Sequence, residues 1–271
     1  MKSATEARNP LTKNIDKAST YEMLDMISKE NMNSVLAVDR ALKEIVSVVD
    51  AATKALEAGG RIIYVGCGTS GRIAVADAAE CPPTYGVDYD TVIAVIAGGE
   101  SALVRASENA EDSAERGKED LLARNITSDD IVIGISASGN AAYVVSALKA
   151  AKELGCVTAS LSCNHECKIA EVADYAIVTE TGAEVITGST RMKAGNAQKM
   201  VLNMISTCAM VKTGKVYENL MINLSPTNIK LRARMIGIVT DILGTDTETS
   251  EKLLEENDFS IPKAIASHRG E

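Results

Sequence analysis

The sequence predicts an α/β protein whose core is a parallel sheet of five strands. Short apolar runs rich in β-branched residues recur along the middle of the chain, and such runs are typical of strands buried on both faces. Segments with apolar residues at helical spacing fill the intervals between them. Strands that alternate with helices favour a parallel sheet with helices on both faces. The predicted strands are 61–65, 91–97, 131–135, 156–162 and 175–179, and the helices among them are 70–80, 101–124 with a break near 112–117, 141–154 and 166–173.

The first strand leads into a loop rich in glycine and hydroxyl groups, residues 66–71, and then into a helix. The glycines permit the sharp turn that such a loop needs. Backbone N–H groups and the positive end of the helix dipole point into the loop, where Thr69 and Ser70 can donate further hydrogen bonds. The sequence therefore predicts an anion site here. We expect the helix to end at Glu80, because Cys81 and two prolines follow.

The glycine pattern of this loop, GxGxxG, also occurs in dinucleotide-binding proteins. Those proteins carry an acidic residue after the second strand, about 20 residues further on. Here the second strand instead runs into Gly98, Gly99 and Glu100. Hydroxyl groups inside the loop also suit a compact phosphate better than a pyrophosphate lying on bare backbone. We therefore favour a small phosphorylated ligand over NAD or FAD.

Two further polar segments support a phosphorylated ligand. Residues 136–140, Ser-Ala-Ser-Gly-Asn, follow another apolar run and precede another helix. Residues 187–195 open a helix that we expect to reach about residue 213, and this opening carries Arg191 and Lys193. The alternative is that these are ordinary strand-to-helix turns in which serine caps the helix. Two such loops in one sheet favour a site in which one loop holds a phosphate and the other orients the rest of the ligand.

Composition excludes several classes of function. The formal net charge of −9 argues against nucleic acid as a partner, because binding to a phosphate backbone needs a basic face. No apolar run reaches the length of a membrane span. The six cysteines lack the density of a disulfide scaffold and no signal peptide precedes them, so we expect reduced thiols and a cytoplasmic location. The segment 163–167 contains two cysteines and a histidine but lacks a second ligand pair, which disfavours a metal site.

Helices are predicted on both sides of the α/β region. A first helical pattern begins after Ser19, whose spacing to Glu22 suits a capping box, and a second is predicted over 32–57. Near the C-terminus a helix is predicted over 229–243, followed by a second capping box from Thr245 to Glu248. We expect an N-terminal arm with helices, a central ligand-binding domain and a C-terminal helical tail, with the bounds 1–53, 54–217 and 218–271.

Acid–base chemistry in such a site would fall to carboxylates, since no histidine lies near the loops. Glu80 has apolar neighbours, and burial among them would raise its pKa, although an exposed position on the helix is an equal alternative. Glu108, Glu111 and Asp112 form a second acidic cluster, for which a solvated helix face is the simpler interpretation.

Several specific motifs resemble those of the N-acetylmuramic acid 6-phosphate etherases, over roughly residues 5–245. AECPPT and GSTRMKAG in particular are not general features of sugar isomerase (SIS) domains. The matching segments are TEARNP at 5–10, GTSGR at 68–72, DAAECPPTYG at 77–86, AGGESAL at 97–103, ENAED at 108–112, SASG at 136–139, TGSTRMKAGNAQK at 187–199 and GKVYENLM at 214–221.

The resemblance implies an SIS-type three-layer αβα sandwich with a five-stranded parallel sheet, flanked by N- and C-terminal helices. It implies a cytoplasmic, cofactor-free lyase without a metal, which cleaves the D-lactyl ether of a phosphosugar in cell-wall recycling. It also implies a homodimer, and neither nucleic acid nor membrane as a partner. A regulator that binds sugar phosphate without catalysis and a sugar-phosphate isomerase are alternatives on the same fold.

The family's two catalytic glutamates fall on Glu80 and Glu111. The resemblance leaves open which of the two is the acid and which is the base at each step. Ser189 could instead cap the helix that follows it. The residues expected to hold phosphate, sugar or lactate carboxylate are Gly68, Thr69, Ser70, Arg72, Ser136, Ser138, Gly139, Ser189, Arg191 and Lys193.

Overall fold

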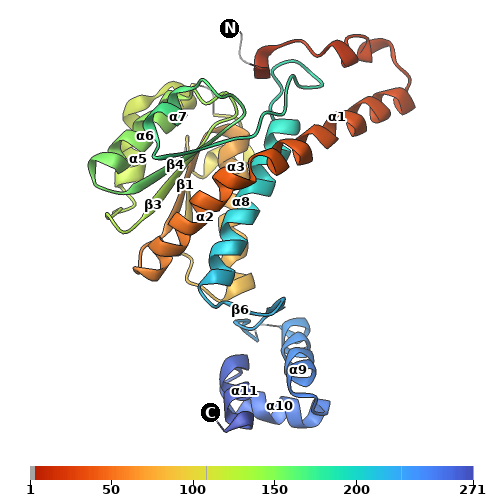
Figure 1. Cartoon of the computed structure of the whole chain (residues 1–271), viewed down its shortest axis with the longest axis vertical. Coiled ribbons are helices and arrows are strands. Elements are labelled where there is room, and N and C mark those ends of the chain that lie inside the picture. Colours follow the sequence, from red (N-terminus) through yellow and green to blue (C-terminus); the bar gives the residue numbers. More distant parts are fainter. Residues whose placement is uncertain (1–3, 108, 227, 271) are drawn as a thin grey trace. The chain divides into compact units, whose positions relative to one another are not determined.

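The computed structural model describes residues 4–107, 109–226 and 228–270. Within these ranges five strands form one sheet in the order β2-β1-β3-β4-β5, and each neighbouring pair is parallel (Figure 1). The predicted α/β fold with a five-stranded parallel sheet is confirmed. The predicted strand bounds are each correct to within one residue. The strands are β1 (Ile62–Gly66), β2 (Val92–Ile96), β3 (Ile131–Ile135), β4 (Val157–Ser162) and β5 (Tyr175–Val178).

Helices cover both faces of the sheet (Figure 1). Because side chains alternate along a strand, β1 contributes to both layers: Ile63 and Val65 pack into the core beneath α5, α6 and α7, whereas Tyr64 faces α3. The second layer is made by α2, α3 and α8. The helices of these layers are α2 (Leu42–Glu57), α3 (Gly68–Tyr85), α5 (Ala114–Leu122), α6 (Ala142–Glu153), α7 (Lys168–Val172) and α8 (Lys193–Lys212).

The region between β2 and β3 is more broken than its predicted helix. It contains α4 (Ser101–Val104) and the 3₁₀ turn η4 (Ala110–Asp112) before α5 begins. Asn109 adopts a left-handed backbone conformation, with φ of 61°, directly before η4. Such a residue interrupts a regular helix, so the predicted helix over 101–124 is wrong in its first half. Its predicted break near 112–117 is also placed too late, because α5 already begins at Ala114.

The N-terminal helix is longer than predicted. The arm forms three short 3₁₀ turns, η1 (Ala4–Glu6), η2 (Pro10–Thr12) and η3 (Ile15–Lys17), and then α1 runs from Thr20 to Arg40. The predicted capping box of Ser19 and Glu22 is confirmed. The predicted interruption before residue 32 is wrong, and the break lies at Ala41 instead. The helix continues through the polar residues 28–31, of which Glu30 is buried and lies against Lys193.

The helix α3 continues past its predicted end. It runs to Tyr85 and contains both Pro82 and Pro83, so the predicted end at Glu80 is wrong. Proline cannot donate a backbone hydrogen bond, but two prolines in the last turn remove only two such bonds. Gly86, with φ of 64°, then ends the helix and donates its N–H to the carbonyl oxygen of Pro82 at 2.9 Å.

The chain divides into two compact units. The first comprises Met1–Ala78 and Asp90–Ala209, and the second comprises Ala79–Tyr89 and Met210–Glu271. The predicted three-part division at residues 53 and 217 stays a prediction. The helices that the structure describes are each too short or too polar to cross a membrane.

The second unit has its own apolar core, formed by side chains such as Met235, Val239 and Leu254. Asn228 caps α9, which ends at Gly244 as predicted. The predicted capping box of Thr245 and Glu248 is wrong by one residue, because the side chain of Asp246 accepts the Thr249 N–H at 2.8 Å. In addition to the end of α3, this unit contains β6 (Val216–Tyr217), β7 (Leu220–Met221), α9 (Ile229–Leu243), α10 (Thr247–Glu256) and α11 (Ile261–Arg269).

One buried carboxylate fastens the N-terminal ends of β1 and β3. The carboxylate of Asp130 accepts hydrogen bonds from the Arg61 backbone N–H at 2.8 Å, from the Arg61 guanidinium at 2.7 Å and from the Thr127 N–H at 2.8 Å. Burial alone would raise the pKa of Asp130, but the hydrogen bonds from Arg61 and Thr127 outweigh it, so the pKa lies below its usual value.

We predict that Asp130→Asn lowers the free energy of unfolding by about 2 kcal/mol or more, because Arg61 loses its charged partner. A lowered folded-state pKa gives stability that is present above the unfolded pKa and is lost as the pH falls through the folded value. The difference between the two proteins should therefore be constant above about pH 4 and shrink below it, as measured by urea unfolding. Glu153→Gln, which breaks an exposed ion pair with Lys118, should leave the free energy of unfolding nearly unchanged. An equal effect of both variants would contradict the prediction.

Candidate active site

The two serine loops begin side by side. The strands β1 and β3 are neighbours, and their last residues, Gly66 and Ile135, are paired in the sheet. From β1 the chain goes to β2 on one side and then returns to β3 on the other, so the strand order reverses between β1 and β3. In open α/β sheets, ligands bind in the crevice at such a reversal, beyond the carboxyl ends of the strands.

The first loop leads into α3, which begins at Gly68 with φ of 51°. The first N–H groups of a helix have no acceptor within it, so those of Thr69 and Ser70 are directed toward the loop. Ser70 is buried, and its hydroxyl donates to Oε1 of Gln198 on α8 at 2.8 Å. Thr69 is partly exposed. The loop thus combines backbone donors with one hydroxyl that is already hydrogen-bonded.

The second loop is closed by its own serines. The Gly139 N–H donates to the backbone oxygen of Ser136 at 3.0 Å and to its Oγ at 3.1 Å. The Ser138 hydroxyl lies 3.4 Å from that of Ser136 and accepts the Asn140 N–H at 3.2 Å. From behind, the amide of Asn164 donates to the carbonyl oxygens of residues 137 and 138. Ser136 is buried and Ser138 is half-buried, so the Ser138 hydroxyl lies nearer the surface.

Glu111 lies close to the first loop. It belongs to η4 and its side chain is exposed. Burial raises the pKa of the Cys67 thiol to about 12, and the negative charges of Glu111 and Asp112 contribute to this rise. Those carboxylates therefore lie near the turn that follows β1. Glu108, the third member of the predicted acidic cluster, lies outside the described residues.

Glu80 lies on α3 in the second unit, and its side chain is exposed. Of the two alternatives for Glu80, burial among apolar neighbours is wrong and an exposed position is correct. The reason is helical geometry: Ala78 and Cys81 are buried, whereas residues 79 and 80 lie on the other face.

Two of the three cations expected near the ligand, Arg72 and Lys193, have protein partners. The Arg72 guanidinium donates to the carbonyl oxygens of Leu103 at 3.1 Å and Arg105 at 3.2 Å, which holds the segment after α4. The ammonium group of Lys193, with the residue 1% exposed, forms an ion pair with Glu30. The Arg191 side chain is exposed.

A carboxylate of the chain itself occupies the start of α8. The Lys193 N–H donates to Oε2 of Glu184 at 3.1 Å, and the Ala194 N–H donates to its Oε1 at 3.0 Å. Glu184 is fully buried there. Ser189 is half-buried and lies four residues before the helix begins, so it is not the residue that caps it. Of the three polar segments, the two serine loops therefore remain open to an outside anion.

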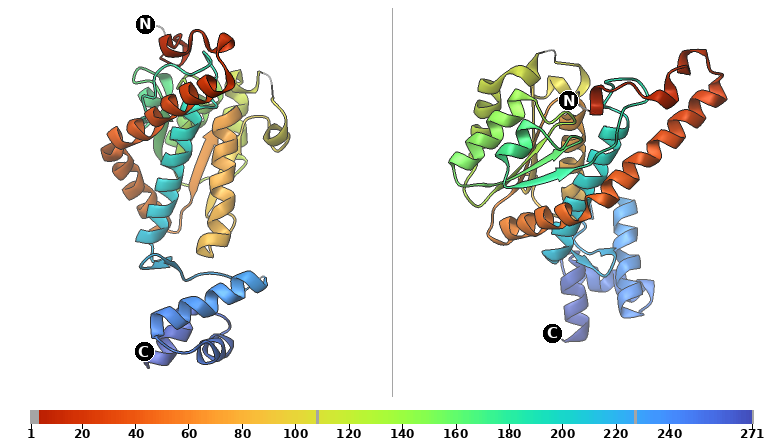
Figure 2. Two further views of the ribbon diagram at one scale, coloured as in Figure 1. Left: turned by 90° about the vertical axis from the view of Figure 1, so that its right-hand side faces the viewer. Right: turned by 45° about the horizontal axis from the view of Figure 1, so that its top comes forward.

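Sequence reasoning missed the partners of these residues, namely Glu30, Asn164, Glu184 and Gln198. Gln198 lies inside a motif that carries the family resemblance, but neither its type nor its spacing indicates that it contacts Ser70. The contact joins residues that are far apart in the chain, and only the packing of α8 against α3 brings them together (Figure 2).

A cavity of about 840 Å³ lies beside β2 rather than at the serine loops. Its lining includes residues of β2, α4 and α5, together with Asn109, Ala110 and Tyr143. The hydroxyl of Tyr143 donates to Asp120 at 2.7 Å. Asn109 and Ala110 line this cavity directly before Glu111, so it adjoins the candidate site without containing its serines.

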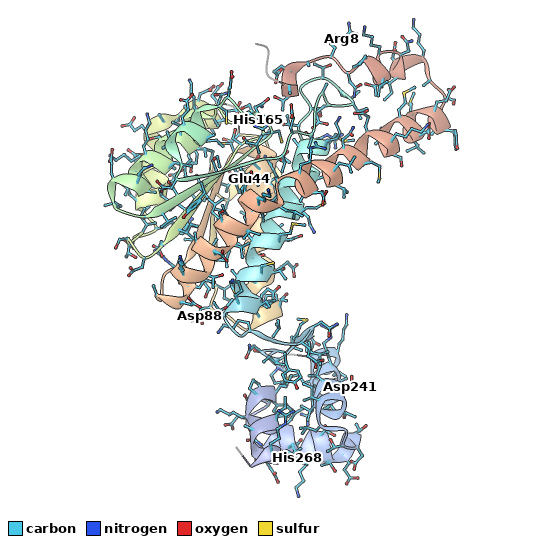
Figure 3. The ribbon with its side chains drawn as sticks, viewed as in Figure 1. Arg8, Glu44, Asp88, His165, Asp241 and His268 are labelled. Carbon is cyan, nitrogen blue, oxygen red and sulfur yellow. The ribbon has the colours of Figure 1, made fainter. Side chains whose placement is uncertain are left out.

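No cluster suited to a metal ion occurs among the residues that the structure describes. His165, labelled in Figure 3, is exposed, and its Nε2 lies 3.6 Å from a carboxylate oxygen of Glu180. His268 belongs to the second unit. The acid–base groups that remain near the first serine loop, among the described residues, are the carboxylates of Glu111 and Asp112.

Comparison with known proteins identifies the family. The chain is 49% identical over 261 residues to N-acetylmuramic acid 6-phosphate etherase 2 of Vibrio parahaemolyticus, covering 96% of this chain and 87% of that protein. The chain belongs to the N-acetylmuramic acid 6-phosphate etherase family. Etherases of Enterobacter sp. (strain 638) and Salmonella agona are 49% and 48% identical, each over 96% of this chain and 88% of their own. The resemblance found in the sequence motifs is thereby confirmed.

The SIS architecture of this etherase-family chain is supported independently. The model of the glucokinase regulatory protein N-terminal SIS domain matches residues 44–152, and that of the SIS domain matches 107–207. Phosphoheptose isomerase GmhA from Neisseria gonorrhoeae has a TM-score of 0.53 at 20% identity, over 70% of this chain and 98% of its own. A phosphoheptose isomerase from Francisella tularensis has a TM-score of 0.54 at 16% identity, over 71% of this chain and 98% of its own. At these identities the solved structures show a shared fold alone.

We predict that Gly139→Ala disrupts the second loop. Gly139 has φ of 74°, and a Cβ there would collide with Sγ and Cβ of Cys167. The free energy of unfolding should fall by about 2 kcal/mol or more, and sugar-phosphate affinity should fall with it. Gly68→Ala is the matched control, because φ is 51° but no atom lies within 4 Å. In this control the free energy of unfolding should fall by only about 1 kcal/mol. Thermal unfolding compares the two variants, and equal losses would show that contact with Cys167 is unimportant.

Proposed function

We propose that this protein cleaves the D-lactyl ether bond of N-acetylmuramic acid 6-phosphate and releases N-acetylglucosamine 6-phosphate and D-lactate. It would thus act as a carbon–oxygen lyase in the recycling of cell-wall sugars. The observation that carries this proposal is the identity of 48–49% with etherases over 96% of the chain. The paired serine loops support the proposal, because their backbone N–H groups and hydroxyls would suit the phosphate of such a substrate.

The 6-phosphate is proposed to lie between the two serine loops. Backbone N–H groups at the start of α3 and the hydroxyls of Ser70 and Ser138 would donate to its oxygens. Glu184 keeps the phosphate from the start of α8 by occupying that position itself. The sugar would extend from this anchored end toward the acidic residues, since Glu111 lies near the first loop.

The proposed chemistry is elimination followed by hydration. In the open-chain sugar the C1 aldehyde acidifies the proton on C2, and a carboxylate removes it. The electron pair forms a C2–C3 double bond as the C3–O bond breaks, and lactate leaves with a proton from a carboxylic acid. Water then adds its oxygen to C3, and a proton returns to C2. In the net reaction, the ether and one water molecule give the sugar with a hydroxyl on C3 and lactate, so the reaction itself consumes no cofactor.

Glu80 and Glu111 are the proposed acid–base pair. In this proposal Glu80 is the principal acid and base and donates a proton to the lactate oxygen, while Glu111 removes or returns a proton at C2. Both side chains are exposed in the isolated chain, so the bound sugar has to exclude water from them if they are to act as efficient proton donors and acceptors. Proton transfer by a positioned side chain contributes about 10²–10⁴-fold to a rate.

We predict that the protein releases D-lactate from N-acetylmuramic acid 6-phosphate, and that reaction in ¹⁸O-water places the label on C3 of the sugar. Glu80→Gln and Glu111→Gln should each lower kcat by about 10²–10⁴-fold while substrate binding persists. Enzymatic lactate detection and isothermal calorimetry measure the two properties. Binding without lactate release by the unaltered protein would indicate a sugar-phosphate regulator. Isomerisation that leaves the oxygen on C3 unlabelled would indicate an isomerase.

We also propose that the protein is a cytoplasmic homodimer. Its six free cysteines are compatible with a reducing compartment. Apolar side chains lie exposed along α1 and α2, most of them separated by three or four residues or by multiples of these. A stripe of this kind on one helical face is a common site of association. Its exposed members are Leu24, Met32, Val35, Leu36, Leu42 and Val46.

We predict that the double substitution Val35→Glu and Val46→Glu converts the dimer to a single chain, because the new charges would be buried without partners. Val35 is 50% exposed and Val46 is 57% exposed, so the folded chain itself should tolerate both. Val104→Glu is the control, since Val104 is 85% exposed and lies outside the stripe. Light scattering after size-exclusion chromatography gives the mass. A double variant that remains dimeric would place the interface elsewhere.

A further inference from the structure

Gln198 of α8 has a polar group that its surroundings do not satisfy. The residue is 1% exposed, and its Oε1 accepts the hydroxyl of Ser70 at 2.8 Å. Its Nε2 is buried and has no hydrogen-bond partner among the described residues. Buried donors are nearly always paired in folded proteins, and an unpaired one is destabilising. The exception here lies directly behind the hydroxyl that faces the proposed phosphate site.

Among the described residues, a single hydrogen bond fixes the orientation of the Gln198 amide. The oxygen and nitrogen of an amide occupy nearly equivalent positions, and their orientation is fixed by the hydrogen bonds that they make. Only the bond to Ser70 fixes it here, because no described residue holds Nε2. A half-turn about the last side-chain bond would present Nε2 to Ser70 in place of Oε1. The hydroxyl of Ser70 could form a hydrogen bond with either atom.

The two orientations have opposite effects on Ser70. With Oε1 toward Ser70, the hydroxyl proton is held by Gln198 and only oxygen lone pairs remain for a ligand. With Nε2 toward Ser70, the hydroxyl accepts a proton from the amide and its own proton becomes available to an anion. A hydroxyl that accepts one hydrogen bond also becomes a better donor. A phosphate in the loop therefore favours the second orientation, since hydrogen bonds to charged oxygens are the stronger ones.

The backbone that carries Gln198 is fixed. The start of α8 is held by Glu184, which accepts the N–H groups of Lys193 and Ala194. One turn before Gln198, a Cβ on Gly195 would lie 3.3 Å from Cγ2 of Thr69, so the helix packs closely on the first loop. Of the groups that meet Ser70 from this side, the amide is the part that can change without moving the helix.

We propose that Gln198 is a positioning residue that sets the direction of the Ser70 hydroxyl, accepting from it in the empty site and donating to it when a phosphate is bound. The proposal depends on the proposed function, because it takes the phosphate of the substrate to lie at the first loop. It goes beyond that function in assigning the affinity of the loop partly to a side chain that does not touch the ligand. Glutamine suits this role because it can both donate and accept, whereas glutamate can only accept when ionised.

The central test is Gln198→Met, which keeps the length and approximate volume of the side chain but removes both hydrogen-bonding atoms. We expect KM for N-acetylmuramic acid 6-phosphate and Kd for inorganic phosphate each to rise about tenfold, with kcat nearly unchanged. The melting temperature should stay the same or rise, because the unpaired buried N–H is removed. Gln198→Glu should weaken phosphate binding more strongly, since the new charge repels the anion.

Three comparisons make this test decisive. In a Ser70→Ala background, Gln198→Met should add no further loss of affinity, because its effect passes through Ser70. Asn203→Leu, on the same helix, removes a partly buried hydrogen bond to Asp77 and should lower the melting temperature while leaving KM unchanged. If Gln198→Met lowers the melting temperature with KM unchanged, Gln198 is a structural tether and the proposal is overturned. Full additivity with Ser70→Ala would equally overturn it, by showing that Gln198 affects binding independently of Ser70.

The Ser70→Ala variant distinguishes failure of the proposed phosphate site from failure of the positioning role of Gln198. If Ser70→Ala leaves the affinity for inorganic phosphate unchanged, the phosphate does not lie at the first loop, and both proposals fall together. If Ser70→Ala weakens binding but neither Gln198 variant does, the loop binds phosphate and the positioning role alone is wrong.

Discussion

The pairing of β1 with both β2 and β3 is the constraint on which the rest of the first unit depends. Crossovers between parallel strands are right-handed. When the chain reverses the direction in which it adds strands to the sheet, the next connecting helix therefore lies on the opposite face. The chain moves outward from β1 to β2 and then back across to β3 and β4. As a result α3 and α6 start from neighbouring strands but lie on opposite faces (Figure 1). Two helix N-termini thus point at one crevice, and the serines of both loops follow from that geometry.

The start of α8 is a polar helix N-terminus that is not open to an outside anion. A helix N-terminus attracts any nearby anion, and α8 receives the carboxylate of Glu184 from within the chain. The ammonium group of Lys193 is likewise neutralised by Glu30 of α1, which also accepts the Asn9 amide at 2.8 Å. The N-terminal arm, α1 and the start of α8 are therefore joined by buried charges and hydrogen bonds. These groups serve the fold and leave the serine loops as the open anion sites.

Local signals in the sequence predicted the strands and most helices well, and long-range contacts account for the errors. The strand over 131–135 was predicted with its observed bounds because its apolar run is uninterrupted. The break in the N-terminal helices was predicted too early, and the sequence gives no sign that Glu30 of this helix is buried against Lys193, far along the chain. The serines of both loops could be predicted from their position after buried strands. Gln198 could not, since its role arises from tertiary packing and no spacing in the sequence encodes it.

The polar contacts between α3 and α8 in the first unit differ in the number of hydrogen bonds that hold them. Deeper in the layer, Asp77 accepts hydrogen bonds from Tyr64, Asn203 and Ser206. Burial raises the pKa of Asp77 while these three donors oppose the rise, so the carboxylate is held from several sides. Near the loop, a single hydrogen bond joins Ser70 to an amide whose other end has no partner among the described residues. The helices are thus held in register by the inner contact, which allows the outer one to respond to a ligand without any movement of the fold.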